Sequence, residues 1–126
     1  MDIIKNNLLD LRELLIALDQ SKGLNAHLCT DLNCRIPSSD ARPLASAIYT
    51  IIYQLQKITG SELSIDLDEH LDRYQITLTA YTQNVESPQL NDAVLSVLNS
   101  YGATVEWTVR QGQYVKIELR FPKTIS

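Results

Sequence analysis

The sequence has little of what proteins need to bind nucleic acids or membranes. Its 126 residues carry 11 Lys and Arg against 15 Asp and Glu, a net charge of −4, and no basic run. Such a chain offers little attraction to a phosphate backbone or an anionic lipid surface. Asp10, Arg12 and Glu13 interrupt the first apolar stretch, which excludes a signal peptide or a membrane span there. We therefore expect a cytoplasmic protein that binds neither nucleic acid nor membrane.

Cysteine, histidine and glycine are also scarce, at two, two and four residues. Cys29 and Cys34 have only His27 nearby, which is too few ligands for a tetrahedral metal site. We expect two reduced cysteines, no metal and no cofactor. No glycine occurs between Gly60 and Gly102, so a glycine-rich phosphate-binding loop is excluded from the middle of the chain.

The composition that remains is that of an ordinary folded domain, with 44% hydrophobic and 21% charged residues. A heptad-like apolar seam predicts a helix over about residues 2–20. Its members are Ile4, Leu8, Leu11, Leu15 and Leu18. Two interpretations stay open: the helix pairs with a second copy, as a dimerisation element of residues 1–21 before a globular domain of 22–126, or it folds back onto its own domain.

Alternating and helical periods predict the other elements. They are a strand at 24–28, a helix at 40–58, hairpin strands at 63–67 and 76–80, a helix at 89–100, and hairpin strands at 105–109 and 115–121. The order is α-β-α-β-β-α-β-β. We predict an α+β fold, a two-layer α/β sandwich whose mixed, mainly antiparallel sheet is covered by helices on one face.

Two stretches carry a more specific signal. The second helix reads SSDARPLASAIYTIIYQLQK and leads into a hairpin, and the chain closes with LNDAVLSVLNSYGATVEWTVRQGQYVKIELRFP. Over residues 22–122 this order resembles the ATPase domain of sensor histidine kinases and the wider GHKL group. In that family the helix has the form L-x-x-x-L-x-N-L-x-x-N-A after a frequent Asp. The matching residues here are Asp40, Leu44, Ile48, Thr50, Ile51, Gln54 and Leu55.

The resemblance also shows which parts of the nucleotide site are missing. In the family the second Asn of the motif holds the magnesium ion on the phosphates, and Gln54 takes its place here, although Mg²⁺ tolerates little displacement of a ligand. The adenine-binding D-x-G is expected within residues 79–83, which read TAYTQ. The family's glycine-rich lid is reduced to NVESPQ at 84–89. The fold is therefore expected without ATP binding.

These observations predict a non-catalytic regulatory or scaffolding protein of a signalling system rather than an enzyme. It would act by contact with a protein such as a response regulator or a kinase, and as a homodimer, through the apolar face of the first helix. That helix contains no histidine that would accept a phosphoryl group. The alternative is a small-molecule sensor that uses the vacated nucleotide cleft, lined by Tyr49, Tyr53, Gln54 and Tyr81.

Overall fold

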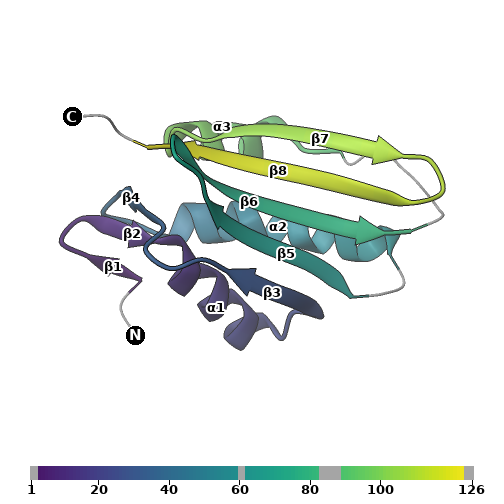
Figure 1. The fold of residues 1–126 in the computed structure, drawn as a ribbon, viewed down its shortest axis with the longest axis horizontal. Coiled ribbons are helices and arrows are strands. Elements are labelled where there is room, and N and C mark those ends of the chain that lie inside the picture. Colours follow the sequence, from purple (N-terminus) through teal and green to yellow (C-terminus); the bar gives the residue numbers. More distant parts are fainter. Residues whose placement is uncertain (1–2, 60–61, 83–88, 124–126) are drawn as a thin grey trace.

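The computed structural model describes residues 3–59, 62–82 and 89–123, which contain three helices and eight strands (Figure 1). In chain order they are β1 Ile4–Lys5, β2 Leu8–Asp10, α1 Leu11–Lys22, β3 Ala26–Thr30, β4 Arg35–Pro37, α2 Arg42–Ile58, β5 Leu63–Glu69, β6 Arg73–Tyr81, α3 Asp92–Ser100, β7 Thr104–Arg110 and β8 Tyr114–Pro122. Most of the segment predicted to replace the nucleotide lid, 84–89, lies outside the described residues.

Five strands form the main sheet in the order β3-β5-β6-β8-β7. β3 runs parallel to β5, and the other three pairs are antiparallel. The strands alternate, so Leu78, Ile117 and their neighbours point to one face and Thr77 and Glu118 to the other. The predicted mixed, mainly antiparallel sheet is confirmed.

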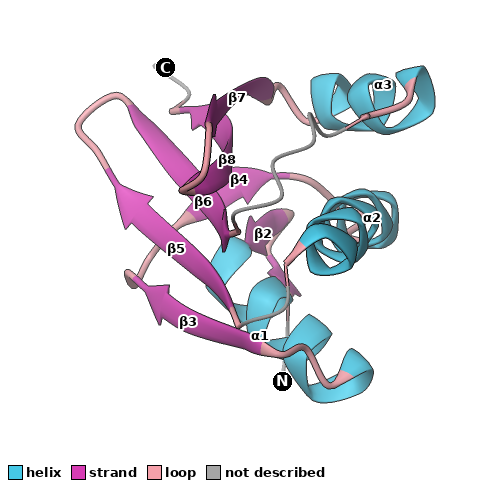
Figure 2. Cartoon of the chain, turned by 90° about the vertical axis from the view of Figure 1, so that its right-hand side faces the viewer, coloured by secondary structure: helices cyan, strands magenta, loops and turns pink. Residues whose placement is uncertain are grey.

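The helices cover only one face of this sheet, as the side view in Figure 2 shows. The apolar faces of all three meet the inward side chains of β5, β6 and β8 in one hydrophobic core. α2 supplies the central part, and six of its residues are buried: Leu44, Ala47, Ile48, Ile51, Ile52 and Leu55. The predicted two-layer sandwich is therefore confirmed.

The N-terminal segment differs from its prediction. Residues 4–10 form the hairpin of β1 and β2, and β2 pairs with β4 in a small antiparallel sheet. Asn6 and Asn7 have positive φ angles of 55° and 60°, as a tight hairpin turn requires. The helix begins at Leu11, because the Asp10 side chain accepts a hydrogen bond from the Glu13 backbone N–H at 3.2 Å. The prediction of a helix from residue 2 was wrong, and the strand β4 lies in a segment for which no strand was predicted.

α1 folds back onto its own domain. Leu11 and Leu15 are completely buried, Leu18 is 6% exposed, and Leu9 of β2 is buried beside them. All four belong to the same core as α2 and the sheet. In the structure, residues 1–21 are thus not a separate helical element beside a domain of 22–126, because their apolar side chains complete that domain's core.

Candidate functional site

The predicted interaction surface on the first helix is not available at the surface. Leu11, Leu15 and Leu18 fill the core, since the seam that suggested a docking face is the seam by which α1 packs on its own domain. Ile4 lies on β1 and is half-buried, and only Leu8, at 39% exposure, remains open to solvent. The structure therefore answers the open question about this helix in favour of folding back.

The two tyrosines predicted to line a cleft lie on the flank of α2 nearest α1. The ammonium of Lys22, the last residue of α1, sits 5.1 Å from the centre of the Tyr49 ring. The Tyr53 ring is 6.5 Å from that of Tyr49, and Lys57 lies 4.5 Å above Tyr53. Such cation–π contacts anchor partly exposed rings by modest amounts. Tyr49 and Tyr53 thus form a surface patch beside α1.

The opposite flank of α2 faces α3 across an open groove of about 320 Å³. Its walls are small or apolar side chains: Pro43, Ser46, Ala47 and Thr50 of α2, and Asn91, Ala93, Val94 and Val97 at and along α3. Gln54 follows Thr50 by one helical turn on this flank. The Gln54 Oε1 atom is buried and has no hydrogen-bond partner. Gln54 is therefore beside the groove and apart from the tyrosines.

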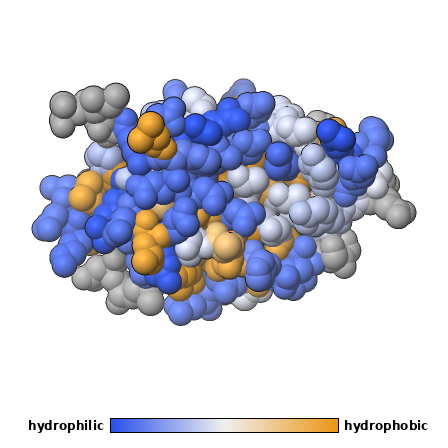
Figure 3. Space-filling model, in the orientation of Figure 1, coloured by the Kyte–Doolittle hydropathy of each residue, from blue (hydrophilic) through white to orange (hydrophobic). Residues whose placement is uncertain are grey.

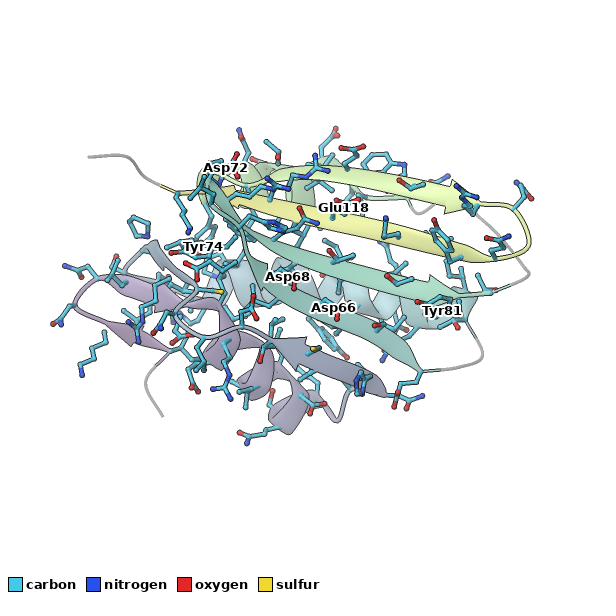
Figure 4. All side chains as sticks on the ribbon, in the orientation of Figure 1. Asp66, Asp68, Asp72, Tyr74, Tyr81 and Glu118 are labelled. Carbon is cyan, nitrogen blue, oxygen red and sulfur yellow. The ribbon has the colours of Figure 1, made fainter. Side chains whose placement is uncertain are left out.

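Tyr81 belongs to neither flank. It ends β6, and its side chain is on the outer face of the sheet (Figure 4). Its ring is edge-on to that of Tyr114, with 6.4 Å between the ring centres. Its backbone carbonyl accepts a hydrogen bond from the Thr59 hydroxyl at 2.8 Å. The structure therefore does not bring Tyr49, Tyr53, Gln54 and Tyr81 together, and the predicted lining of the vacated cleft was wrong.

The outer face of the sheet is polar, as the blue surface in Figure 3 shows. Glu118 organises its centre: the carboxylate accepts hydrogen bonds from Arg120 at 3.0 Å and from the Gln75 amide at 3.1 Å, and lies 3.7 Å from Lys116. Arg120 also donates to Glu106 on β7 at 2.7 Å. Ion pairs on an open face contribute little stability each. This network links side chains of three neighbouring strands, β6, β8 and β7.

Asp66 and Asp68 of β5 lie on this face, as Figure 4 shows. Partial burial, followed by the charges of Asp31 and Asp66, raises the pKa of Asp68 above its usual value. His70 follows the strand, and its Nε2 atom is buried without a partner. Within the described ranges, no group of three or more His, Cys, Asp or Glu side chains is placed to hold a metal ion.

The two cysteines differ in environment. Cys29 is exposed on β3, whereas Cys34 is buried, and burial together with the charges of Asp31, Glu69 and Asp10 raises the Cys34 pKa to about 11.

Since the thiolate is the reactive form, we expect Cys29 to react rapidly with a disulfide reagent at pH 8 and Cys34 to react at least about a hundredfold more slowly. Stopped-flow absorbance with the native protein measures both rates, and unfolding in guanidinium should equalise them. Two equally fast thiols in the native protein would contradict the placement of Cys34.

Sequence inspection missed the groove between α2 and α3. Its signal was present, because small residues recur at helical spacing in both helices, as at Pro43, Ala47 and Thr50. Where two helices carry small side chains on facing flanks, their contact leaves space at the surface.

None of the helices in the described part of the chain is long and apolar enough to span a membrane.

No protein-family model and no curated protein sequence matches this chain. Solved structures do match its fold. The histidine kinase domain of the E. coli osmosensor EnvZ has a TM-score of 0.77 at 7% identity, over 98% of this chain and 92% of that one. The Acinetobacter baumannii histidine kinase AdeS has a TM-score of 0.76 at 10% identity, over 97% of this chain and 70% of the kinase.

A third match is the histidine kinase ThkA in complex with the response regulator TrrA, with a TM-score of 0.70 at 13% identity, over 93% of this chain and 41% of that one. At such identities the likeness concerns the fold. The chain has the histidine kinase ATPase-like fold that the sequence predicted. The first two matches extend over nearly the whole chain, so the fold takes in α1.

Proposed function

We propose that this protein is a non-catalytic regulatory or scaffolding component of a two-component signalling system, built on a histidine kinase ATPase-like fold that does not bind ATP. The observation that supports it is the chemistry of the groove between α2 and α3. This groove lies on the flank of α2 that carries Thr50 and Gln54, the two positions at which the resembling family has its Asn residues.

A nucleoside triphosphate needs cationic or metal-binding groups around its phosphates and a polar partner for its base. The groove-lining residues that the structure describes include no Asp, Glu, Lys or Arg. Asn91 is engaged as the N-cap of α3, where its side-chain oxygen accepts from the Val94 backbone N–H at 2.8 Å. These groups favour apolar contact over phosphate binding.

One observation on a protein of the same fold supports the proposed partner class. ThkA, which shares this fold, forms a complex with a response regulator. We propose a response regulator or a kinase as the partner of this chain too, and self-association as a homodimer. The contact must use surfaces other than the apolar face of α1, because Leu11, Leu15 and Leu18 are buried.

The first test is ligand-induced stabilisation. A ligand present at a hundred times its dissociation constant adds about 2.7 kcal/mol to the free energy of unfolding, which shifts the melting temperature of a domain this size by several degrees. We expect no shift with Mg-ATP or Mg-ADP at about 5 mM, a hundred times a dissociation constant of about 50 μM. A reproducible rise with Mg-ATP but not with free Mg²⁺ would contradict the proposal.

The contact itself needs a second experiment. Calorimetric titration with purified receiver domains of the response regulators from the same organism should find one that binds in the micromolar range while the others do not. Binding should be unchanged by added Mg-ATP. If no receiver or kinase domain binds, the signalling role fails even where the absence of ATP binding holds.

The alternative function, a small-molecule sensor, has less support. It required Tyr49, Tyr53, Gln54 and Tyr81 to converge on one cleft, as polar groups do in ligand pockets. They lie on two flanks of α2 and on the outer face of the sheet. The groove beside Gln54 is open, and we do not propose a second function for it.

A further inference from the structure

The strand β7 forms an open edge of the main sheet. It is last in the strand order, and no strand of the described chain pairs with its second side (Figures 1 and 2). It pairs with β8 over seven residues without interruption, from Thr104 opposite Arg120 to Arg110 opposite Tyr114. Edge strands are usually protected by shortness, Pro, a bulge, a covering segment or charged side chains, above all Lys. β7 is seven residues long with no Pro, Lys or bulge, and its two charged residues, Glu106 and Arg110, have opposite signs, so its outer edge can pair with a strand of complementary charge.

The backbone of β7 presents three residues to that edge. The Arg110 carbonyl accepts a hydrogen bond from the Gln113 N–H at 3.0 Å, so the backbone of Arg110 faces the hairpin. Alternation along an antiparallel strand then directs the N–H and C=O groups of Val105, Trp107 and Val109 away from β8. Trp107, the single tryptophan of the chain, lies at the middle of the strand and is 42% exposed.

We propose that β7 is a dimer interface, where β7 of a second copy pairs with it in antiparallel orientation about a two-fold axis at Thr108. In this register Thr108 lies opposite Thr108 of the second copy, Trp107 opposite Val109, and Glu106 opposite Arg110. A two-fold axis makes the last two pairs twice. Threonine pairs, aromatic with β-branched pairs and opposite charges are the favourable cross-strand neighbours.

The charges select this register. Arg110 is exposed and has no ion-pair partner within the described part of the chain, and Glu106 is 59% exposed with its Oε2 atom on Arg120. In the dimer, the Glu106 carboxylate of the second copy lies opposite Arg110 and can pair with it. A register moved by two residues places Trp107 opposite itself and Glu106 opposite Thr108, which leaves both Arg110 side chains unpaired. This interface concerns self-association and holds whatever the signalling partner is.

One strand pair is a small interface compared with those of permanent dimers. We therefore expect dissociation in the micromolar range and a test that traps the dimer. The variant Cys29→Ser with Thr108→Cys places two thiols directly opposite each other, within disulfide distance. The control, Cys29→Ser with Thr104→Cys, changes the same residue type on the same face of β7, but its two thiols stand about 27 Å apart along the strands. The remaining thiol, Cys34, is buried in both variants.

With diamide as the oxidant, the Thr108→Cys variant is expected to become a covalent dimer and the Thr104→Cys variant to remain monomeric. Both should melt cooperatively like the parent, which shows that they are folded. Equal cross-linking of the two variants, or none in either, would overturn the proposal. So would sedimentation as a monomer at all concentrations up to about 200 μM, the result expected if the edge instead receives a segment of another protein.

Charge reversal tests the register without cysteine. Arg110→Glu replaces two attractive pairs by two repulsive ones and should raise the dimer dissociation constant about tenfold. The double variant Glu106→Arg with Arg110→Glu exchanges the charges and should restore dimerisation. Arg12→Glu makes the same change on α1, which lies by β3 at the opposite edge of the sheet (Figure 1), and should leave the dissociation constant unchanged. If the double variant is no better than Arg110→Glu alone, this register is wrong.

Discussion

Replacing Leu15 by Asp is expected to unfold the protein at room temperature. The Leu15 side chain is fully buried on α1, so the substitution removes a packed apolar group and places a carboxylate without a partner in the core. The free energy of unfolding should fall by at least about 4 kcal/mol, which is comparable to the whole stability of a domain. Urea denaturation followed by circular dichroism measures it, and we expect no folded baseline for this variant.

Leu8→Asp is the matched control, because Leu8 belongs to the same predicted seam but lies 39% exposed on β2. Asp at this position faces solvent and the neighbouring Lys5, so the expected cost is less than about 1 kcal/mol. If Leu15→Asp stays folded and only lowers the association state, α1 is a dimerisation face after all. If both variants lose a similar free energy of unfolding, the burial of Leu15 on α1 does not explain the effect of Leu15→Asp.

Long periodic elements were predictable from the sequence. α2 carries six buried apolar residues at helical spacing, and the two hairpins alternate inward and outward residues over strands of seven to nine residues. Turns with distinctive residues separate them, such as Gly112 with a positive φ of 74°. Because periodicity, turn chemistry and burial agree in these elements, the architecture followed from them.

The N-terminal hairpin was not predicted, because its strands of two and three residues are too short to show a period. A spacing of four from Ile4 to Leu8 fits a helix as well as a hairpin. Two local signals favoured the hairpin: the Asn6–Asn7 pair, which tolerates positive φ, and Asp10 with Glu13 three residues later, which is typical of a helix start.

The prediction that four residues line one cleft was wrong for a geometric reason that can be read from the sequence. Gln54 is five positions after Tyr49, which at 3.6 residues per turn places the two about 140° apart around α2. Only Gln54 is on the flank of Thr50, and Tyr49 faces α1. The position of Tyr81 depends on the strand alternation, which directs Ala80 into the core and Tyr81 outward.

The histidine kinase ATPase-like fold and the chemistry of its nucleotide site depend on different residues. The fold rests on buried side chains such as Leu44, Ile51 and Ile117. The nucleotide chemistry of the resembling family depends on a few polar groups beside α2, and there this chain has Thr50 and Gln54. Polar residues at these two positions do not stabilise the core, and a buried amide oxygen without a donor, as at Gln54, opposes folding.

A chain that begins at Gly23 is expected not to fold. Removing residues 1–22 takes away five leucines that are almost completely buried: Leu9, Leu11, Leu14, Leu15 and Leu18. Each buried leucine contributes about 2–5 kcal/mol, so together they exceed the stability of a typical domain. Circular dichroism and amide chemical-shift dispersion of residues 23–126 should show an unfolded or aggregated chain. A cooperative melt close to that of the full chain would contradict the core assignment.

Adding a peptide of residues 1–22 to that fragment gives the complementary measurement. Since β2 pairs with β4 and α1 packs on the core, the peptide should restore the dispersed spectrum at a one-to-one ratio. The same peptide with Leu15→Asp should not, whereas the peptide with Leu8→Asp should. Restoration by the parent peptide and the Leu8→Asp peptide, but not by the Leu15→Asp peptide, would make the N-terminal segment an internal part of the fold. The segment's apolar face is then never free to dock, because Leu11, Leu15 and Leu18 stay within the core.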